Sequence, residues 1–330
     1  MKLQNRNGEP LTIGRFLIAT LLAGLVCSTL GTVRAQDYPK QPLRIYTSDP
    51  GGGTDLLSRI LAQGISGPLG QPVIVENRGG NVVITAGAVA KAPPDGYTLL
   101  VWAQGVWLAQ YLESASYDPL RDLSPITLAV MQPSVVVIHP AVPAKSIPEL
   151  IAVAKARPGE LNYAGSGIGG TTQLSTELLK SMAGVNIVRV NYKSTGAGLL
   201  ATVGGETQLM LPTANAAMPH VKQGKLRALA VTSAKATALV PGLPAVAETL
   251  PGYEAVTMTG VFAPNKTPST VITRLHQEMT RVLTSADVKE KFFNAGSEVV
   301  ANTPEQFAAA IKVDMARWAK VIKDAGIRME

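Results

Sequence analysis

Short β-branched runs alternate with helix-like segments along most of the chain, and this alternation predicts the α/β class. Such a pattern is typical of βαβ units built around largely parallel sheets. In the first part of the chain we expect strand 43–47, helix 54–66, strand 73–76, helix 85–91, strand 98–102, and the strand-like runs 126–130 and 135–138.

A second series of strands and helices begins near Lys145. Ser146 and Glu149 form a capping box with Pro148 inside the first turn, which predicts a helix that reaches about Arg157. After it we expect strand 161–163, helix 171–182, strand 187–190, helix 197–203, strand 208–211, helix 214–223, strand 226–231 and the apolar run 256–262.

Two long helices close the chain, the first from Thr267 and the second from the capping box of Thr303 and Gln306. They have no sheet of their own, so we expect them to pack on a sheet that is already built. This organisation predicts one lobe of 36–130 with 260–330, another of 138–255, and crossovers at 128–139 and 254–261. Open α/β sheets bind ligands in a crevice at the carboxyl ends of their strands.

Two glycine-rich turns lie at such strand ends, and each opens a helix. The first is 49–55, Asp-Pro-Gly-Gly-Gly-Thr-Asp, and the second is 164–172, Ala-Gly-Ser-Gly-Ile-Gly-Gly-Thr-Thr. Consecutive glycines let backbone N–H groups approach a ligand, since no Cβ stands in the way. The helix that begins there adds free N–H donors and the positive end of its dipole. Together the turns predict a two-sided clamp for a small anion.

The N-terminal segment 1–35 has the pattern of a secretory signal. Basic residues precede an apolar stretch from Phe16 to Leu30, and Val33-Arg34-Ala35 fits a cleavage site after Ala35. A membrane anchor is the alternative, but the apolar stretch is short for a span. Lipidation at Cys27 is a further alternative, which the bulky Val26 disfavours.

Composition removes several classes of function. Cys27 is the only cysteine, so cleavage leaves a chain without disulfides, thiolate metal sites or a cysteine nucleophile. The formal charge of +7 falls to +4, because the signal carries four bases and one acid. This mildly basic balance suits an anionic ligand, but no Lys/Arg cluster indicates nucleic-acid binding.

Three features of the sequence point to other chemistry, but each of them is incomplete. Residues 165–170 match G-x-G-x-x-G, but no acid ends the next strand to read a ribose. Ser166 lacks the glycines of a nucleophile elbow. The three histidines, His139, His220 and His276, form no triad or metal spacing. Asp55 is expected to orient the first turn at its helix N-terminus, and Asp49 is expected to point away from an anion.

Several short blocks, in order over almost the whole mature chain, resemble the receptors of the tripartite tricarboxylate transporter family, often called Bug-type receptors. The blocks are Tyr38–Pro42, Pro50–Asp55, Val75–Arg78, Pro94–Leu100, Tyr117–Pro119, Leu161–Tyr163, Lys180–Val185 and Gly224–Val231. Each block is weak alone, and their order makes the resemblance specific.

The resemblance implies a two-lobe periplasmic binding protein of the type II, Venus-flytrap architecture. It implies that both glycine turns hold a carboxylate, largely through backbone N–H groups and ordered waters. Carried over onto this sequence, the implied residues are Gly51, Gly52, Gly53, Thr54, Gly165, Ser166, Gly169, Gly170 and Thr171. It further implies a monomer that serves integral membrane transporter subunits, with no cofactor or metal.

Departures from the family pattern bear on the ligand. Leu211-Pro212-Thr213 replaces a segment that carries an acid in many members, and Trp102–Trp107 replaces smaller residues. We therefore expect a ligand less polar than a hydroxylated tricarboxylate, with Trp107 as a wall or, equally, as a core residue. Gln104, Thr213 and Asn215 are the expected selectors.

Three functions remain open at this point. A solute receptor that delivers a small carboxylate to a membrane transporter is the leading interpretation. The alternatives are a ligand-sensing subunit of a signalling system, which would use the same clamp, and an exported hydrolase or isomerase.

Overall fold

The computed structural model describes residues 38–166 and 169–327. The signal segment, with Cys27 and the cleavage site, and residues 167 and 168 of the second glycine turn lie outside them. The contacts group the chain from Pro39 onward into one unit, which holds both sheets.

The elements in chain order are β1 (Leu43–Thr47), α2 (Gly53–Leu69), β2 (Val73–Asn77), α3 (Val82–Ala90), β3 (Thr98–Ala103), α4 (Gly105–Leu112), β4 (Leu123–Pro133), β5 (Val135–Ile138), α5 (Ile147–Ala156), β6 (Asn162–Ser166), α6 (Thr171–Ala183), β7 (Val188–Tyr192), α7 (Thr195–Val203), β8 (Leu209–Met210), α8 (Ala214–Lys222), β9 (Arg227–Val231), η2 (Val246–Glu248), β10 (Val256–Pro264), α9 (Ser269–Leu283), α10 (Ala286–Asn294), β11 (Glu298–Val299) and α11 (Pro304–Asp324).

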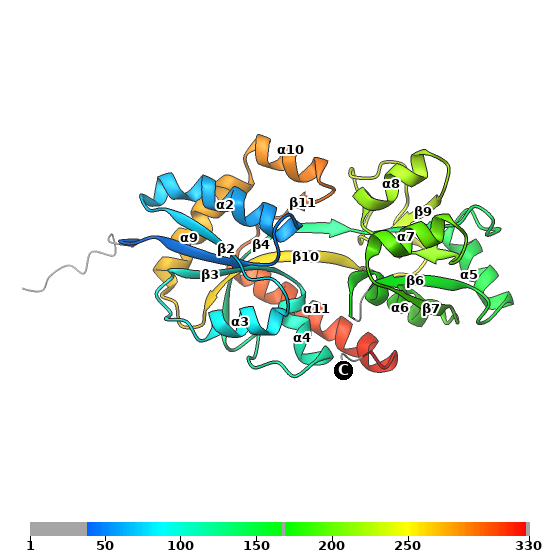
Figure 1. Ribbon diagram of the computed structural model, residues 1–330, viewed down its shortest axis with the longest axis horizontal. Helices are drawn as coiled ribbons and strands as arrows, with labels where there is room; N and C mark the ends of the chain where they lie inside the picture. Colours follow the sequence, from blue (N-terminus) through cyan, green and yellow to red (C-terminus); the bar gives the residue numbers. More distant parts are fainter. Residues whose placement is uncertain (1–37, 167–168, 328–330) are drawn as a thin grey trace, which may run out of the picture. The chain divides into compact units, whose positions relative to one another are not determined.

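The first sheet has six strands in the order β11-β4-β10-β3-β1-β2 (Figure 1). β1 lies in the middle of its parallel part, where Ile45 faces Val75 of β2 and Leu99 of β3. β10 pairs antiparallel with both β3 and β4, and β11 pairs antiparallel with β4. The first glycine turn follows β1 and therefore lies at the carboxyl end of the parallel strands of this sheet.

The second sheet has five strands in the order β7-β6-β8-β5-β9. β6 pairs parallel with β7 and β8, whereas β5 pairs antiparallel with β8 and β9. Both sheets are therefore mixed, although we expected mostly parallel ones. The difference arises at the strands by which the chain changes sheet, β4, β5 and β10, because they enter against the local strand direction.

The chain passes between the sheets at two adjacent places. Ser134 separates β4 from β5, and the return runs from β9 to β10. The Ser134 N–H donates to Thr232 Oγ1 at 2.7 Å, and the Thr232 N–H donates to the Ser134 carbonyl at 2.9 Å. The Ala255 N–H donates to the Thr232 carbonyl at 2.9 Å. Thr232 thus ties the two connecting segments together; the lobe boundaries expected from the sequence stay a prediction.

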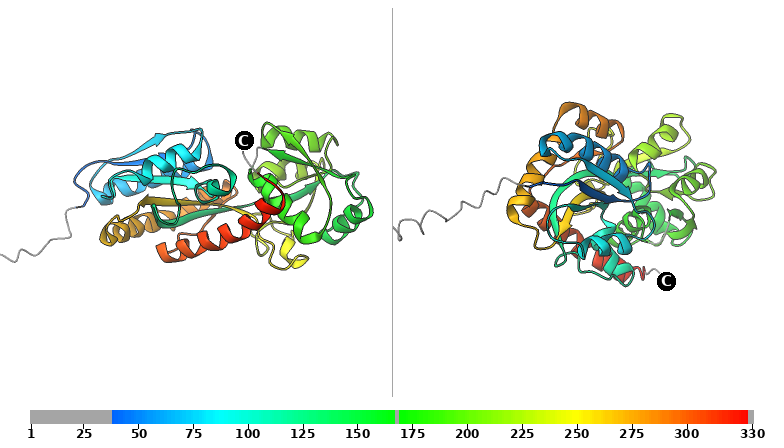
Figure 2. Two further views of the ribbon diagram at one scale, coloured as in Figure 1. Left: turned by 90° about the horizontal axis from the view of Figure 1, so that it is seen from below. Right: turned by 60° about the vertical axis from the view of Figure 1, so that its left-hand side comes forward.

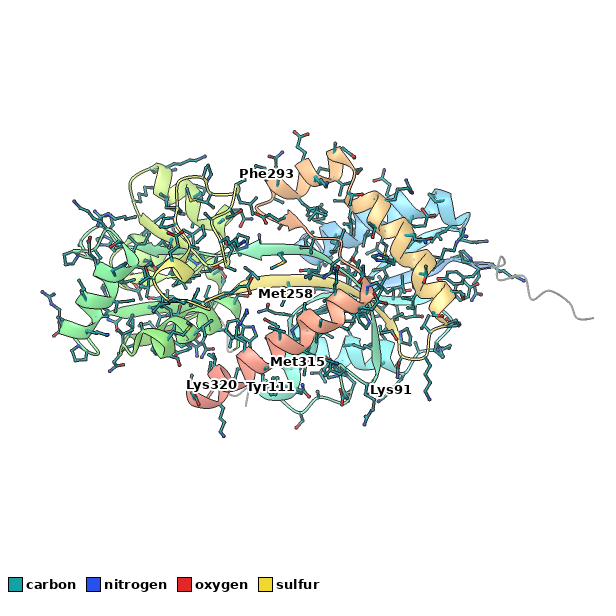
Figure 3. The ribbon with its side chains drawn as sticks, turned by 180° about the vertical axis from the view of Figure 1, so that it is seen from behind. Lys91, Tyr111, Met258, Phe293, Met315 and Lys320 are labelled. Atoms are coloured by element: carbon teal, nitrogen blue, oxygen red, sulfur yellow. The ribbon has the colours of Figure 1, made fainter. Side chains whose placement is uncertain are left out.

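The long C-terminal helix α11 packs on α4 and β4 of the first part of the chain and on α6 of the second (Figure 2). The expected capping box is present at its start: the Gln306 N–H donates to Thr303 Oγ1, and the Thr303 N–H donates to Gln306 Oε1. Met315 is buried, whereas Lys320 points outward (Figure 3).

Two α-helices, one 3-10 helix and one short strand go beyond the elements expected from the sequence: α4, α10, η2 and β11. α4 follows β3 directly, in the segment from which we expected a ligand wall. α10 and β11 separate the two helices that were expected to follow one another. No helix in 38–166 or 169–327 combines the length and apolar character that crossing a bilayer requires.

Candidate functional site

The first glycine turn connects β1 to α2 and presents backbone amides at the surface. Gly51 has φ +84°, a left-handed conformation that favours glycine. Gly52 is the N-cap of α2, and no side chain caps it. The first amides of a helix have no partner within the helix, so those of Gly53 and Thr54 are available to a ligand. The Thr54 hydroxyl hydrogen-bonds with the Ser48 hydroxyl within the turn.

Asp55 holds this turn in shape, as expected. Its Oδ2 accepts from the Gly51 N–H at 3.0 Å and from Arg59 Nε at 3.0 Å, and its Oδ1 accepts from Asn77 Nδ2 at 2.8 Å. The hydrogen bond from Arg59 is the main cause that lowers the pKa of Asp55 to about 2, against the opposing effect of burial. Asp49 is exposed and lies against Gly79, away from this network.

We expect Asp55→Asn to lower the free energy of unfolding at pH 7 by about 1–2 kcal/mol, because the amide cannot replace the charge-assisted bonds. Solvent screening limits the effect, since the Arg59 side chain is 57% exposed. Because the pKa of Asp55 is lower in the folded protein than its ordinary value of 3.8, the contribution of Asp55 to stability is fully present above pH 3.8. This contribution is lost as the pH falls toward 2. Urea unfolding should therefore show the difference from wild type shrinking below pH 4.

Asp324→Asn is the matched control for this experiment, because Asp324 bonds to an exposed Lys320 and its loss should change little. A difference between wild type and Asp55→Asn that stays constant from pH 7 to pH 2 would contradict the assigned ion pair.

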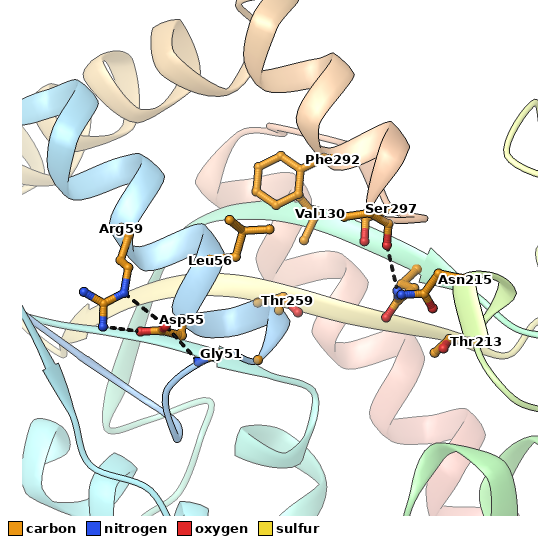
Figure 4. A pocket seen from close by; sticks show the side chains of 14 residues that line it. Gly51, Asp55, Leu56, Arg59, Val130, Thr213, Asn215, Thr259, Phe292 and Ser297 are labelled. Atoms are coloured by element: carbon orange, nitrogen blue, oxygen red, sulfur yellow. Dashed lines mark hydrogen bonds and ion pairs between the residues drawn. The ribbon is translucent and has the colours of Figure 1, made fainter. Parts of the chain in front are cut away.

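A first cavity of about 470 Å³ opens beside the turn. Five parts of the chain contribute to its lining: the first turn with α2, β4, β10, the start of α8, and the segment from α10 to β11 (Figure 4). The lining residues are Gly51, Gly52, Gly53, Asp55, Leu56, Arg59, Val130, Gln132, Thr213, Asn215, Thr259, Phe292, Ala295 and Ser297.

A second cavity of about 330 Å³ lies at the second glycine turn. The N-termini of α6, α7 and α8 contribute to it. Most of its lining residues carry a hydroxyl group, and the full lining is Ser134, Ser166, Thr171, Thr172, Thr195, Gly196, Leu211, Thr213, Asn215 and Ala216. Thr213 and Asn215 line both cavities, so the two are neighbours.

Helix ends and hydroxyls give the second cavity its polarity. No side chain caps α6 at Gly170 or α8 at Thr213, so their first amides are available to a ligand. Ser166 Oγ lies 2.9 Å from Thr172 Oγ1 and 3.1 Å from Thr195 Oγ1. Ser134 Oγ is buried without a hydrogen-bond partner among the described residues. Hydroxyls and helix N-termini are groups that hold an oxyanion.

Gly165 and Gly169 support the second turn without lining either cavity. A Cβ on Gly165 would lie 2.6 Å from Arg189 Nε, and one on Gly169 would lie 2.6 Å from Leu112 Cδ1. The Gly169 N–H donates to Gln173 Oε1 at 2.9 Å, so a side chain already satisfies that amide. Of the described residues of this turn, Ser166, Thr171 and Thr172 line the second cavity.

The structure places Gln104 and Trp107 in the interior rather than at a cavity wall. Gln104 is buried, and its Oε1 accepts from the Met258 N–H at 3.4 Å. Trp107 is fully buried, and its indole N–H donates to Asp314 Oδ2 at 2.8 Å. Of the two interpretations left open for Trp107, the structure supports the core residue; Gln104, likewise, lines neither cavity.

Several other lining residues were not expected from the sequence. Thr195 is the first residue of α7, just after strand β7 and the N-cap Ser194. A helix that begins at a strand end is the same signal that marks the two glycine turns, so the sequence does contain a signal for Thr195. Leu56, Val130, Phe292 and Ser297 carry no motif, and only the pairing of β11 with β4 shows how the last two reach the site.

The cavities show no titratable cluster suited to metal binding or triad chemistry. Among the described residues that line them, Asp55 and Arg59 are the titratable ones, and they pair with one another. In the described part of the chain, no three His, Cys, Asp or Glu side chains gather as metal ligands would.

Comparison with known proteins agrees with the resemblance seen in the sequence. Residues 57–327 match the tripartite tricarboxylate transporter family receptor model. Protein BugT of Bordetella pertussis is 34% identical over 316 residues, which cover 93% of this chain and 97% of BugT.

Solved structures show the same relationship. Rpa4515 of R. palustris, with adipate, has 34% identity and a TM-score of 0.73 over 89% of this chain and 100% of its own. MatC from Rhodopseudomonas palustris, with bound malate, has 28% identity and a TM-score of 0.69 over 86% of this chain and 100% of its own. The chain therefore belongs to the tripartite tricarboxylate transporter family of solute receptors.

Proposed function

We propose that this protein is an exported, periplasmic solute receptor that binds a small organic carboxylate in the two neighbouring cavities and delivers it to integral membrane transporter subunits. The observation that carries the proposal is the set of uncapped helix N-termini, α2 at one cavity and α6 and α8 at the other. Family membership and the relatives with adipate and malate support it.

Neutral groups hold the charge in the proposed mode of binding. Arg59 is already bonded to Asp55 and Asn77, so the carboxylate is stabilised by backbone amides, hydroxyls and helix dipoles. The proposed ligand-binding residues are Gly51, Gly52, Gly53, Thr54, Ser166, Gly170, Thr171, Thr213 and Asn215, with Ser134 and Thr195 added by the structure. Thr54 and Gly170 line neither cavity and are proposed because they belong to the starts of α2 and α6. Gly51 is proposed for its place in the lining, since its own amide donates to Asp55.

The proposed mechanism is hinge closure about the segments that Thr232 ties together. The lobes are the two sequence-predicted ones, 36–130 with 260–330, and 138–255. A ligand that meets donors from both lobes has extra affinity for the closed form, and that difference alone shifts the population. Transporter subunits then recognise the closed receptor.

The proposal predicts that carboxylates, but not their amides, stabilise the purified protein. We expect mono-, di- and aromatic carboxylates of suitable size to raise Tm, since a ligand at 100 times its Kd adds about 2.7 kcal/mol to stability. Thermal shift screening followed by calorimetry measures this, with adipate and adipamide as a matched pair. If no carboxylate binds, or the amide binds as well, the proposal is wrong.

The same samples also distinguish a receptor from an enzyme. We expect NMR spectra of each bound acid to stay unchanged over hours with the protein, as for a receptor. Conversion of the acid would instead favour the exported hydrolase or isomerase.

A further inference from the structure

One side of the first cavity is a hydrocarbon wall that no expected site residue supplies. It consists of Leu56 from the first turn of α2, Val130 from β4 and Phe292 from α10, which converge from distant parts of the sequence (Figure 4). Phe292 and Val130 are buried, but Leu56 keeps 39% of its surface exposed. Leu56 is thus the exposed member of the wall that lines this cavity.

The rest of the cavity has the opposite character. Gly51 of the first turn lies below Leu56, Thr213 and Asn215 lie apart from the wall, and Ser297 lies beside Val130 (Figure 4). Gly52 and Gly53 of the same turn also line the cavity, and the Gly53 amide at the start of α2 is available to a ligand. A ligand that fills the cavity therefore meets hydrogen-bonding groups at its charged end and hydrocarbon along one flank. Covering an apolar surface with hydrocarbon is favourable, whereas a hydroxyl group placed against it loses its hydrogen bonds to water.

The helix geometry fixes which carbon atoms of a ligand reach this wall. Gly53 is the first residue of α2 and Leu56 is the fourth, so about one helical turn, roughly 4–5 Å along the axis, separates them. Helical side chains lean toward the helix N-terminus, so the Leu56 side chain reaches back over this turn toward the Gly53 and Thr54 amides. The carbon atoms nearest to a carboxylate bound at those amides, C2 and C3, are therefore the ones that Leu56 would contact.

We propose that Leu56 is a specificity-determining residue, which makes this receptor select carboxylates with unsubstituted C2 and C3 atoms over their 2- and 3-hydroxy analogues. The inference rests on the proposed function and names the substrate class of that same site. Val130 and Phe292 complete the surface on which the hydrocarbon packs, and Leu56 is the member that a ligand covers.

The test compares acids that differ by one hydroxyl group. Calorimetry gives Kd for succinate and malate, glutarate and 2-hydroxyglutarate, and butanoate and 3-hydroxybutanoate. We expect wild type to prefer the unsubstituted acid of each binding pair by about 10- to 100-fold, the discrimination that an apolar pocket exerts against an added hydroxyl. Leu56→Asn should reduce this ratio to within threefold, and Leu56→Met should preserve it.

Leu120→Asn is the matched control, since Leu120 is 46% exposed and lines neither cavity. It should leave each ratio unchanged. A wild type that binds the hydroxy acids equally well or better, or a ratio that Leu56→Asn does not move, overturns the inference while the carboxylate receptor stands. Failure of all these acids and of the wider carboxylate panel to bind overturns the proposed function, and the inference with it.

Discussion

The substitution Gly53→Val is expected to weaken carboxylate binding at least 100-fold while leaving the fold as stable as wild type. A Cβ built on Gly53 meets nothing within 4 Å, so the protein itself has room for a side chain there. The free space belongs to the first cavity, which Gly53 lines. A valine side chain would stand over the amides that we assign to the carboxylate, and would block the close approach that glycine permits.

Calorimetry and urea unfolding together measure this prediction. Gly53→Ala should show an intermediate loss, about tenfold, since its side chain is a single methyl group. Gly67→Val is the matched control, because Gly67 belongs to the same helix, also has no neighbour within 4 Å of a Cβ, and lines neither cavity. Binding by Gly53→Val within threefold of wild type would show that the ligand does not approach these amides.

The parts of the fold that the sequence predicts well are those with local signals. The capping boxes at Ser146 and Thr303 mark helix starts, and the structure has helices from Ile147 and from Pro304. The two expected runs 126–130 and 135–138 are separate strands, β4 and β5, which Ser134 divides. These signals work because the groups that satisfy a helix end lie within a few residues of it.

The unpredicted elements depend on distant contacts. α4 is eight residues long and rich in large apolar side chains, and the Trp107 indole N–H within it donates to Asp314 of α11, 207 residues away. The antiparallel entry of β10 between β3 and β4 joins segments more than 120 residues apart. A short apolar run does not by itself distinguish helix from strand, or parallel from antiparallel pairing.

The same distinction separates the predicted and unpredicted parts of the candidate site. Glycine turns reveal where a backbone can approach a ligand, and the structure puts Gly51–Gly53 and Thr171 at cavities. Side chains that shape a cavity are found only when the sheet register is known. Trp107 stayed ambiguous in the sequence for the same reason, since a large aromatic residue near a strand end suits a core as well as a ligand wall, and its burial supports the core.

Asp314→Ala should lower the free energy of unfolding by about 3 kcal/mol or more, the largest effect on stability that we expect here. Asp314 is 2% exposed and accepts from two indoles: Trp107 Nε1 bonds to Oδ2 and Trp318 Nε1 bonds to Oδ1, each at 2.8 Å. Without the carboxylate both buried N–H groups lose their acceptor, at about 1–3 kcal/mol each, and a small cavity remains.

The surroundings of Trp107 explain why the structure cannot easily compensate. Its ring centroid lies 6.1 Å from that of Phe262 and 5.9 Å from that of Phe307, so the indole cannot turn toward another acceptor without disturbing the aromatic cluster. Trp107→Phe removes one donor but keeps an aromatic ring, and should cost less than Asp314→Ala. Asp324→Ala, on the exposed side of the same helix, should stay within about 0.5 kcal/mol of wild type.

The contribution of Asp314 to stability also depends on pH, in a direction that its pKa sets. Burial raises the pKa of Asp314, so the folded protein holds the proton more tightly than the unfolded chain does. The contribution of this group to stability therefore declines as pH rises from the ordinary value of 3.8 to the raised one, and is constant above it. Asp314→Ala should lack this decline when urea unfolding is followed from pH 3 upward, and an unchanged profile would contradict the assignment.

Measuring the carboxylate affinity of Asp314→Ala tests whether this buried cluster also contributes to ligand binding. Trp107 and Asp314 line neither cavity, so the folded fraction of Asp314→Ala should bind carboxylates within threefold of wild type, at a temperature where the variant is folded. A large loss of affinity in a folded variant would instead mean that the Trp107 cluster positions α4 and β10 for the ligand. Because Gly53→Val is expected to do the reverse, losing binding but keeping stability, the two variants together test whether fold and recognition depend on different residues.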